Sequence, residues 1–169
     1  IGTSEFHEAL HRIVSFPNTK WEEKTELKDV RNMRRFSRSS VTELIKGKNR
    51  IRISSSHPLV GYGLESAPAK ILSSRKVDSL DTPENRFIKY ALDIFLKFSV
   101  EINSKAQKLN AHSQLAKESE QLVAQLENHL HHTVFSEISA PQLLKLNSPV
   151  LQRKEGYREV LRVWLMFDL

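Results

Sequence analysis

Apolar residues near the start of the chain recur at the spacing of an amphipathic helix. Phe6, Leu10, Ile13 and Val14 fall on one face when three to four positions separate successive turns. Pro17 then ends the segment, because proline cannot continue the helical hydrogen-bond pattern. The pattern therefore predicts a short helix that buries one side.

The stretch after Pro17 is less regular. Trp21, Leu27, Val30 and Met33 fit a second helix over residues 21–36, although their spacing is uneven. Alternation and β-branched residues favour short strands or extended segments at Ile51-Arg52-Ile53 and across Ile71, Leu72 and Val77, with a loop over residues 54–63.

The clearest helix start lies at residues 82–84. Thr82 can cap the helix, and Pro83 suits its first position, where a missing N–H costs nothing. Glu84 in the first turn is favoured by the helix dipole. Apolar residues keep helical spacing beyond this point, at Ile88, Leu92, Phe95, Ile102, Ala106 and Leu109. We expect a helix from Pro83 to about residue 108.

A second long helix is expected from Ala111 to Val134. Its apolar side comprises Leu115, Leu122, Val123, Leu126 and Leu130. Two long amphipathic helices with so short a connection should pack antiparallel. The pattern predicts a helical hairpin over about residues 83–134.

The end of the chain predicts shorter helices. Pro141 and Pro149 each suit the first position of a short helix, and Ser148 can cap the second one. Gly156 interrupts the pattern before a closing helix over about residues 157–167.

These patterns predict a mainly α protein. Residues 1–80 should form a small mixed lobe with one or two short strands, and residues 81–169 a helical module. The chain has no cysteine, which excludes disulfides and cysteine-ligated zinc and agrees with a reducing cytoplasm. No apolar run reaches the roughly 20 residues that cross a bilayer, and no signal peptide opens the chain. We therefore expect a cytoplasmic protein without a membrane partner.

Positive charge is the main indication of a partner. The 26 Lys and Arg exceed the 20 Asp and Glu, and such a balance favours nucleic acid. The candidate phosphate-binding residues are Arg31, Arg34, Arg35, Arg38, Lys46, Lys48, Arg50 and Arg52. The alternative is a solvated face, or arginines paired with Glu22, Glu23 and Glu26. No aromatic residues are interleaved with the cluster, so a stacking platform for single strands is not expected.

Three other patterns give weaker indications of a functional site. His129 and His132 have the spacing of helical metal ligands, with His131 beside them, but a zinc site needs three or four protein ligands. No metal site is therefore expected there. The run 54–57 lacks the strand-turn-helix of a nucleophile elbow, and Gly61-Tyr62-Gly63 lacks the remainder of a phosphate-binding loop.

Two motifs resemble a known bacterial family. The string Val77-Asp78-Ser79-Leu80-Asp81-Thr82-Pro83-Glu84-Asn85-Arg86-Phe87-Ile88-Lys89 is similar to the hallmark of the McrC-like and LlaJI-like restriction endonuclease subunits. Their second landmark resembles residues 148–153 followed by 156–161. In that family a helical module precedes a PD-(D/E)XK nuclease core, and the stretch 21–37 resembles the same proteins less specifically.

The resemblance implies a Mg²⁺-dependent nuclease for the full-length protein. The core would continue after Leu169, and we expect no complete active site and no cofactor in this chain. Glu22-Glu23-Lys24 and Glu26-Leu27-Lys28 fit the catalytic tripeptide, but no Asp precedes either. Glu84 resembles an accessory acid of the metal site; the alternative is that it only complements the helix dipole, while Arg86 pairs with a neighbouring acid.

Three hypotheses follow. The first is a non-catalytic region of a restriction endonuclease that engages DNA, serves as a scaffold, or couples the nuclease to an NTP-hydrolysing motor subunit. The second is the ordered part of an active metal-dependent DNA endonuclease. The third is a generic helical module for protein–protein interaction, whose positive charge is incidental.

Overall fold

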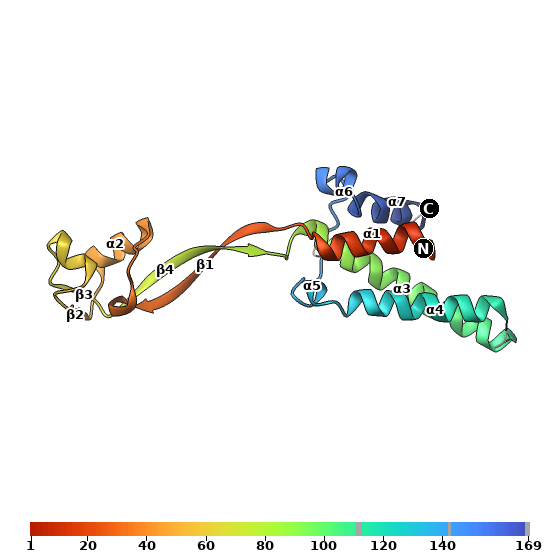
Figure 1. Ribbon diagram of the computed structural model, residues 1–169, viewed down its shortest axis with the longest axis horizontal. Helices are drawn as coiled ribbons and strands as arrows, with labels where there is room; N and C mark the ends of the chain where they lie inside the picture. Colours follow the sequence, from red (N-terminus) through yellow and green to blue (C-terminus); the bar gives the residue numbers. More distant parts are fainter. Residues whose placement is uncertain (111–112, 142, 168–169) are drawn as a thin grey trace. The chain divides into compact units, whose positions relative to one another are not determined.

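The chain folds into two compact units (Figure 1). The computed structural model describes residues 1–110, 113–141 and 143–167. One unit, here called the helical unit, combines residues 1–20 and 79–169, and the other, the basic unit, spans residues 21–78. Helices hold 57% of the described residues and strands 16%, which confirms the mainly α class.

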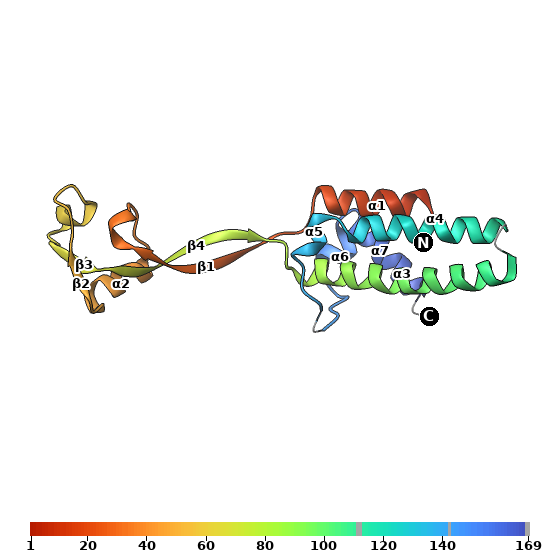
Figure 2. The same cartoon turned by 90° about the horizontal axis from the view of Figure 1, so that it is seen from below.

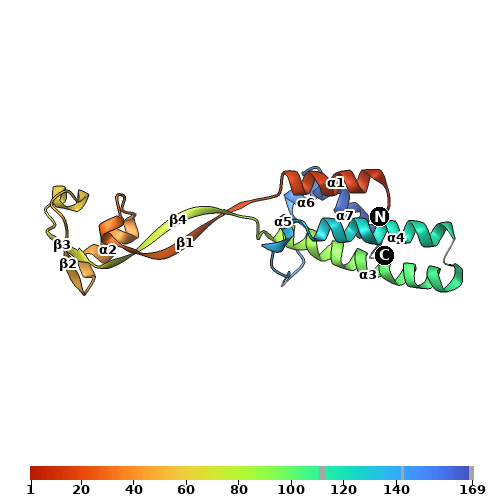
Figure 3. The ribbon, with the colours of Figure 1, turned by 60° about the horizontal axis from the view of Figure 1, so that its bottom comes forward.

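The helical unit contains six of the described helices. They are α1 (Ser4–Ser15), α3 (Pro83–Asn110), α4 (Gln114–Leu130), α5 (Thr133–Ser136), α6 (Pro149–Arg153) and α7 (Tyr157–Phe167). Helices α3 and α4 pack side by side, as Figure 2 shows. Helix α7 packs against α1, α3 and α6 (Figure 3).

Local sequence signals account for several of these boundaries. The Asn85 N–H donates to the Thr82 hydroxyl (3.2 Å), so Thr82 caps the start of α3. Ser148 caps α6, which begins at Pro149. The predicted start at Ala111 lies outside the described residues, and the short helix predicted to begin at Pro141 is wrong: residues 143–148 are not helical.

One aromatic core holds the helical unit together. Phe6, Phe87, Phe95 and Trp164 are all at most 5% exposed, although they come from three separate helices. The Phe6 ring meets Phe95 in edge-to-face geometry, with centroids 5.9 Å apart. The Phe87 ring meets Trp164 in the same way, at 5.8 Å. Helix α1 therefore belongs with the helical unit, and the lobe expected over residues 1–80 begins only at residue 21.

The basic unit mixes short helices with strands. Its elements are β1 (Lys20–Asp29), η1 (Val30–Asn32), α2 (Arg38–Lys46), β2 (Arg50–Arg52), η2 (Pro58–Tyr62), β3 (Ser66–Pro68) and β4 (Lys70–Ser79). Strand β1 pairs with β4, and β2 pairs antiparallel with β3, with Ile51 opposite Ala67. A small core of Val30, Met33, Leu44, Ile53, Leu59, Ala67 and Ile71 lies beneath them.

The helix predicted over residues 21–36 is wrong. Most of that stretch is the ten-residue strand β1. Its partner β4 contains the segment expected to be extended across Ile71, Leu72 and Val77, but is longer, at ten residues. The unit therefore has four strands, where one or two short ones were predicted. Seven of the ten residues of β1 are exposed and none is buried, so the strand lacks the alternation of apolar and polar residues that marks a buried face. Side chains instead interact across the strands, as where the Lys76 ammonium lies 5.5 Å from the Trp21 ring centroid.

None of the helices in the described part of the chain is both long and apolar enough to span a lipid bilayer.

Candidate nucleic-acid interface

The basic unit carries the entire net charge of the chain. Residues 21–78 hold 13 Lys and Arg against 7 Asp and Glu, whereas the remaining residues hold 13 of each. The helical unit is therefore neutral, and the +6 of the whole protein is confined to 58 residues. Such confinement gives a local positive field that the overall composition understates.

Two of the eight predicted phosphate-binding residues already have acceptors within the protein. The Arg31 guanidinium donates twice to the Asp29 carboxylate, at 3.0 and 2.7 Å, and lowers the pKa of Asp29 to about 2. Arg50 donates to the carbonyls of Leu44 and Ser66, at 2.8 and 2.5 Å, and so joins α2 to β3. Both arginines thus already donate to acceptors within the unit, and neither pairs with the glutamates of β1.

The other six cations remain candidates. Each is exposed, and none makes a side-chain hydrogen bond or ion pair with any residue that the structure describes: Arg34, Arg35, Arg38, Lys46, Lys48 and Arg52. They come from the segment before α2, from α2 itself and from β2 with its preceding turn. An exposed cation without an internal partner can give its full charge to a ligand phosphate.

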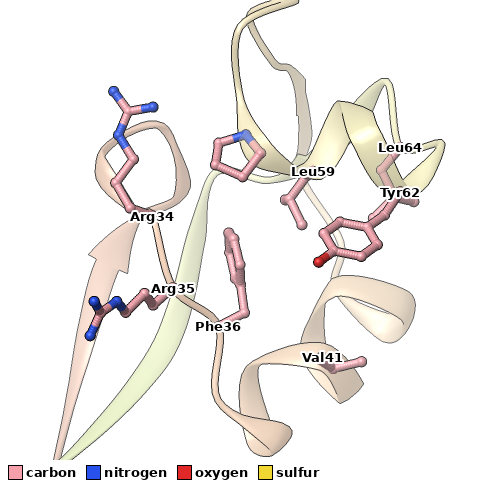
Figure 4. Close-up of a pocket in the computed structure, with 8 residues that line it drawn as sticks. Arg34, Arg35, Phe36, Val41, Leu59, Tyr62 and Leu64 are labelled. Atoms are coloured by element: carbon pink, nitrogen blue, oxygen red, sulfur yellow. The ribbon is translucent and has the colours of Figure 1, made fainter.

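Arg34 and Arg35 border a cavity of about 700 Å³. The rest of its lining is apolar or aromatic: Phe36, Val41, Pro58, Leu59, Tyr62 and Leu64. Figure 4 shows Phe36 at the centre of this group, with Tyr62 on one side and the two arginines on the other. Tyr62 is 83% exposed, which is unusual for a large aromatic side chain.

This arrangement corrects the expectation that no aromatic residues accompany the arginines. Phe36 is next to Arg35 in sequence, but Tyr62 is 27 positions away and joins the group only because η2 packs near α2. The missed signal is Gly61-Tyr62-Gly63, whose glycines leave the tyrosine without neighbouring side chains to cover it. Gly63 ends η2 in the left-handed conformation (φ 77°).

A second cavity, of about 510 Å³, gathers lysines on another part of the same unit. Lys46, Lys48 and Lys70 line it together with apolar side chains that include Leu27 and Leu72. Its one acid, Glu43, accepts a hydrogen bond from the Leu72 N–H at 2.7 Å. The basic unit therefore presents two concave positions, one bordered by arginines and one by lysines.

Glu84 lies in a hydrogen-bond network of the helical unit. One carboxylate oxygen accepts from the Ser148 hydroxyl (2.6 Å) and the other from the Asn18 side-chain amide (3.2 Å). Arg86 pairs with Asp81 at 2.6 Å, which holds the pKa of Asp81 well below its ordinary value. Both acids thus have protein partners, and the contacts of Glu84 extend well beyond the helix dipole.

Asn85 and Tyr157 complete this network. The Asn85 amide donates to the Asn18 and Leu80 carbonyls, at 2.8 and 2.7 Å, and its oxygen accepts from the Tyr157 hydroxyl at 2.5 Å. That hydroxyl also accepts from the Asn18 N–H at 2.7 Å. Burial raises the pKa of Tyr157 to about 12, so the phenol stays protonated and donates. We call Asn18, Leu80, Asn85 and Tyr157 the clasp.

The two Glu-x-Lys tripeptides lie on the exposed strand β1. Glu26 pairs with Lys28 of its own strand at 2.9 Å and lies 3.8 Å from Arg75 of β4. Within residues 1–110, 113–141 and 143–167, no three His, Cys, Asp or Glu side chains are grouped as metal ligands would be. The described contacts of the Glu84 carboxylate are with the protein, because Ser148 and Asn18 each donate a hydrogen bond to it.

The histidines have local contacts instead. His129 stacks on His7 with ring centroids 5.7 Å apart, and burial lowers the pKa of both. His131 Nδ1 is 2.7 Å from the Glu127 carbonyl, and His132 caps α5. His57 is buried in the basic unit, where its ring nitrogens contact the Val30 carbonyl and the Leu59 N–H.

Comparison with known proteins gives one relationship. No curated protein and no solved structure significantly matches the chain. A family described as domain of unknown function (DUF2357) matches residues 2–164, which span both units. The chain therefore belongs to the DUF2357 family.

Proposed function

We propose that the basic unit binds DNA through its phosphates and that the helical unit carries it as a scaffold. The observation that supports this proposal best is the confinement of the +6 charge to residues 21–78, with six exposed cations that no described residue engages. In this proposal α3 and α4 form an antiparallel hairpin of the scaffold and take no part in binding.

The proposed role is non-catalytic for the residues described. In this proposal Glu84 is a structural acceptor, because both of its oxygens accept hydrogen bonds from the protein. The motifs around residues 77–89 and 148–161 suggest a restriction-endonuclease-like protein as the setting. An NTP-hydrolysing motor as partner remains a prediction of that resemblance alone.

The test is the salt dependence of duplex DNA binding by the full chain. Each phosphate contact contributes about 0.9 to the slope of log affinity against log salt. Arg34→Ala with Arg35→Ala should therefore lower the slope by roughly 2 and weaken binding about equally for all sequences. Fluorescence anisotropy across a salt series measures both quantities.

A matched control removes the same charge from the other unit. Lys97→Ala with Lys117→Ala deletes two exposed cations of α3 and α4 and should leave the slope unchanged. Equal losses in both double variants would mean that only the net charge matters, as the generic interaction module predicts. Absence of any salt-dependent binding would refute the proposal.

A further inference from the structure

Resting on the proposed function, we propose that the cavity beside Arg34 and Arg35 receives an unstacked nucleobase of a single-stranded segment. Its volume, about 700 Å³, falls within the range of small-ligand pockets, roughly 300–1,000 Å³. The cavity therefore has room for a base, whereas an intact duplex keeps its bases paired and stacked.

The lining suits a flat aromatic ligand. Leu59 lies in the floor at 4% exposure, and Val41 and Leu64 contribute further apolar surface. The Tyr62 ring stands at the side of the cavity with most of its surface exposed (Figure 4). Stacking on such a ring stabilises any of the bases, because every base has a π face.

The charges around the cavity distinguish a nucleotide from an uncharged ligand. Arg34 and Arg35 lie on the other side of Phe36 from Tyr62, with their guanidinium groups directed away from it (Figure 4). They border the cavity, so they can meet backbone phosphates of a strand that passes its edge. No acid lines the cavity among the described residues. A flat aromatic ring joined to a negative group is the chemistry of a nucleotide within a strand.

Phe36 is the fixed part of this site. Its ring is half-buried and lies edge-on to the buried His57, with centroids 6.1 Å apart. Tyr62, by contrast, touches the small core little, so its replacement should leave the fold intact. Tyr62 is therefore the residue to test.

The experiment compares the binding of a twelve-nucleotide oligothymidine with that of an abasic strand of the same length and charge. Stacking contributes about 1–3 kcal/mol per base, so Tyr62→Ala should weaken oligothymidine binding about tenfold or more. Tyr62→Phe should restore the affinity, and binding of the abasic strand should not respond to either change. Trp21→Ala, which removes an exposed aromatic ring outside the cavity, is the control and should leave both affinities unchanged.

The outcomes separate this inference from the function on which it rests. If both strands bind with a steep salt dependence and Tyr62→Ala affects neither, the basic unit binds phosphates and the base site is refuted. If neither strand nor duplex binds, the proposed function and the base site both fail. A peptide of alternating leucine and glutamate that loses affinity with Tyr62→Ala, while oligothymidine does not, would assign the cavity to a protein partner instead.

Discussion

The two units use charge in opposite ways. In the helical unit equal numbers of acids and bases are present, and the acids of its motif meet partners inside the fold, as Asp81 meets Arg86 and Glu84 meets Ser148. In the basic unit the cations outnumber the acids by nearly two to one, and most of the arginine and lysine cluster meets no described partner. The acids of the helical-unit motif stabilise that unit through their internal partners. The exposed cations of the basic unit are available to a ligand.

This difference in charge between the two units indicates where function should be sought in the fold. The most distinctive motif, around residues 81–86, builds a buried network, while the candidate binding surface has no distinctive motif. Substitutions in the helical unit should therefore change stability without changing intrinsic DNA affinity, and substitutions among the exposed cations should do the reverse.

Asn85→Ala should have the largest effect. It removes three hydrogen bonds and leaves the Tyr157 hydroxyl and the Leu80 carbonyl with fewer partners in a buried place, at a cost of about 3–4 kcal/mol. Urea unfolding followed by Trp164 fluorescence, in a Trp21→Phe background, reports on the helical unit. Asn128→Ala on exposed α4 should cost little, and equal losses in both variants would contradict the role of the clasp.

Gly156→Ala should come next. Gly156 has a φ of 85°, and an added Cβ would lie 2.8 Å from the Ala9 carbonyl oxygen of α1. Strain and contact together should cost about 2–3 kcal/mol, measurable by the same unfolding curve. At Gly2 a Cβ meets nothing within 4 Å, so Gly2→Ala should shift the midpoint hardly at all.

Glu84→Gln should be milder, at about 1–2 kcal/mol, because one of two accepted hydrogen bonds is lost or reversed. Millimolar Mg²⁺ should leave the melting temperature of the native protein unchanged. A rise in that temperature on adding Mg²⁺, absent in Glu84→Gln, would show that this carboxylate binds metal after all.

The smallest effect should be a pH dependence confined to the helical unit. Burial lowers the pKa of His7 and His129 below 6.5, so the unfolded chain binds more protons as the pH falls below about 6.5. The stability is therefore fully present above that pH and decreases on acidification. Melting curves of the Trp164 signal between pH 7 and pH 5 should show the decrease, and His7→Phe should flatten it.

Sequence reasoning succeeded where a segment has one buried face. Helix α7 begins and ends at the predicted residues, and Thr82 with Pro83 correctly marked the start of α3. It failed for β1, where Trp21 and Leu27 are 73% and 65% exposed, so that no periodic pattern of burial exists to be detected. Strand pairing with β4, some fifty residues away, stabilises a segment whose own sequence does not specify it.

The candidate site was foreseen only in part. The six exposed cations could be named because arginines and lysines are rarely buried. The sequence could not show that Arg31 and Arg50 differ from these six in having internal acceptors. Those acceptors are the Asp29 carboxylate and two backbone carbonyls, whose positions depend on the fold. Tyr62 was missed for the same reason, because its place beside Arg34 and Phe36 is a property of tertiary packing.

The clasp has a consequence for how this architecture could change. Asn18 lies three residues before the chain enters residues 21–78, and Leu80 lies two residues after it leaves them. The Asn85 side chain donates to the backbone carbonyls of both. Hydrogen bonds within the helical unit therefore hold together the two chain segments between which residues 21–78 are inserted. Such a junction tolerates exchange of the inserted segment. Grafting a different insert between residues 20 and 79 should therefore leave the helical unit folded, so the helical unit should accept inserted segments of other sequence.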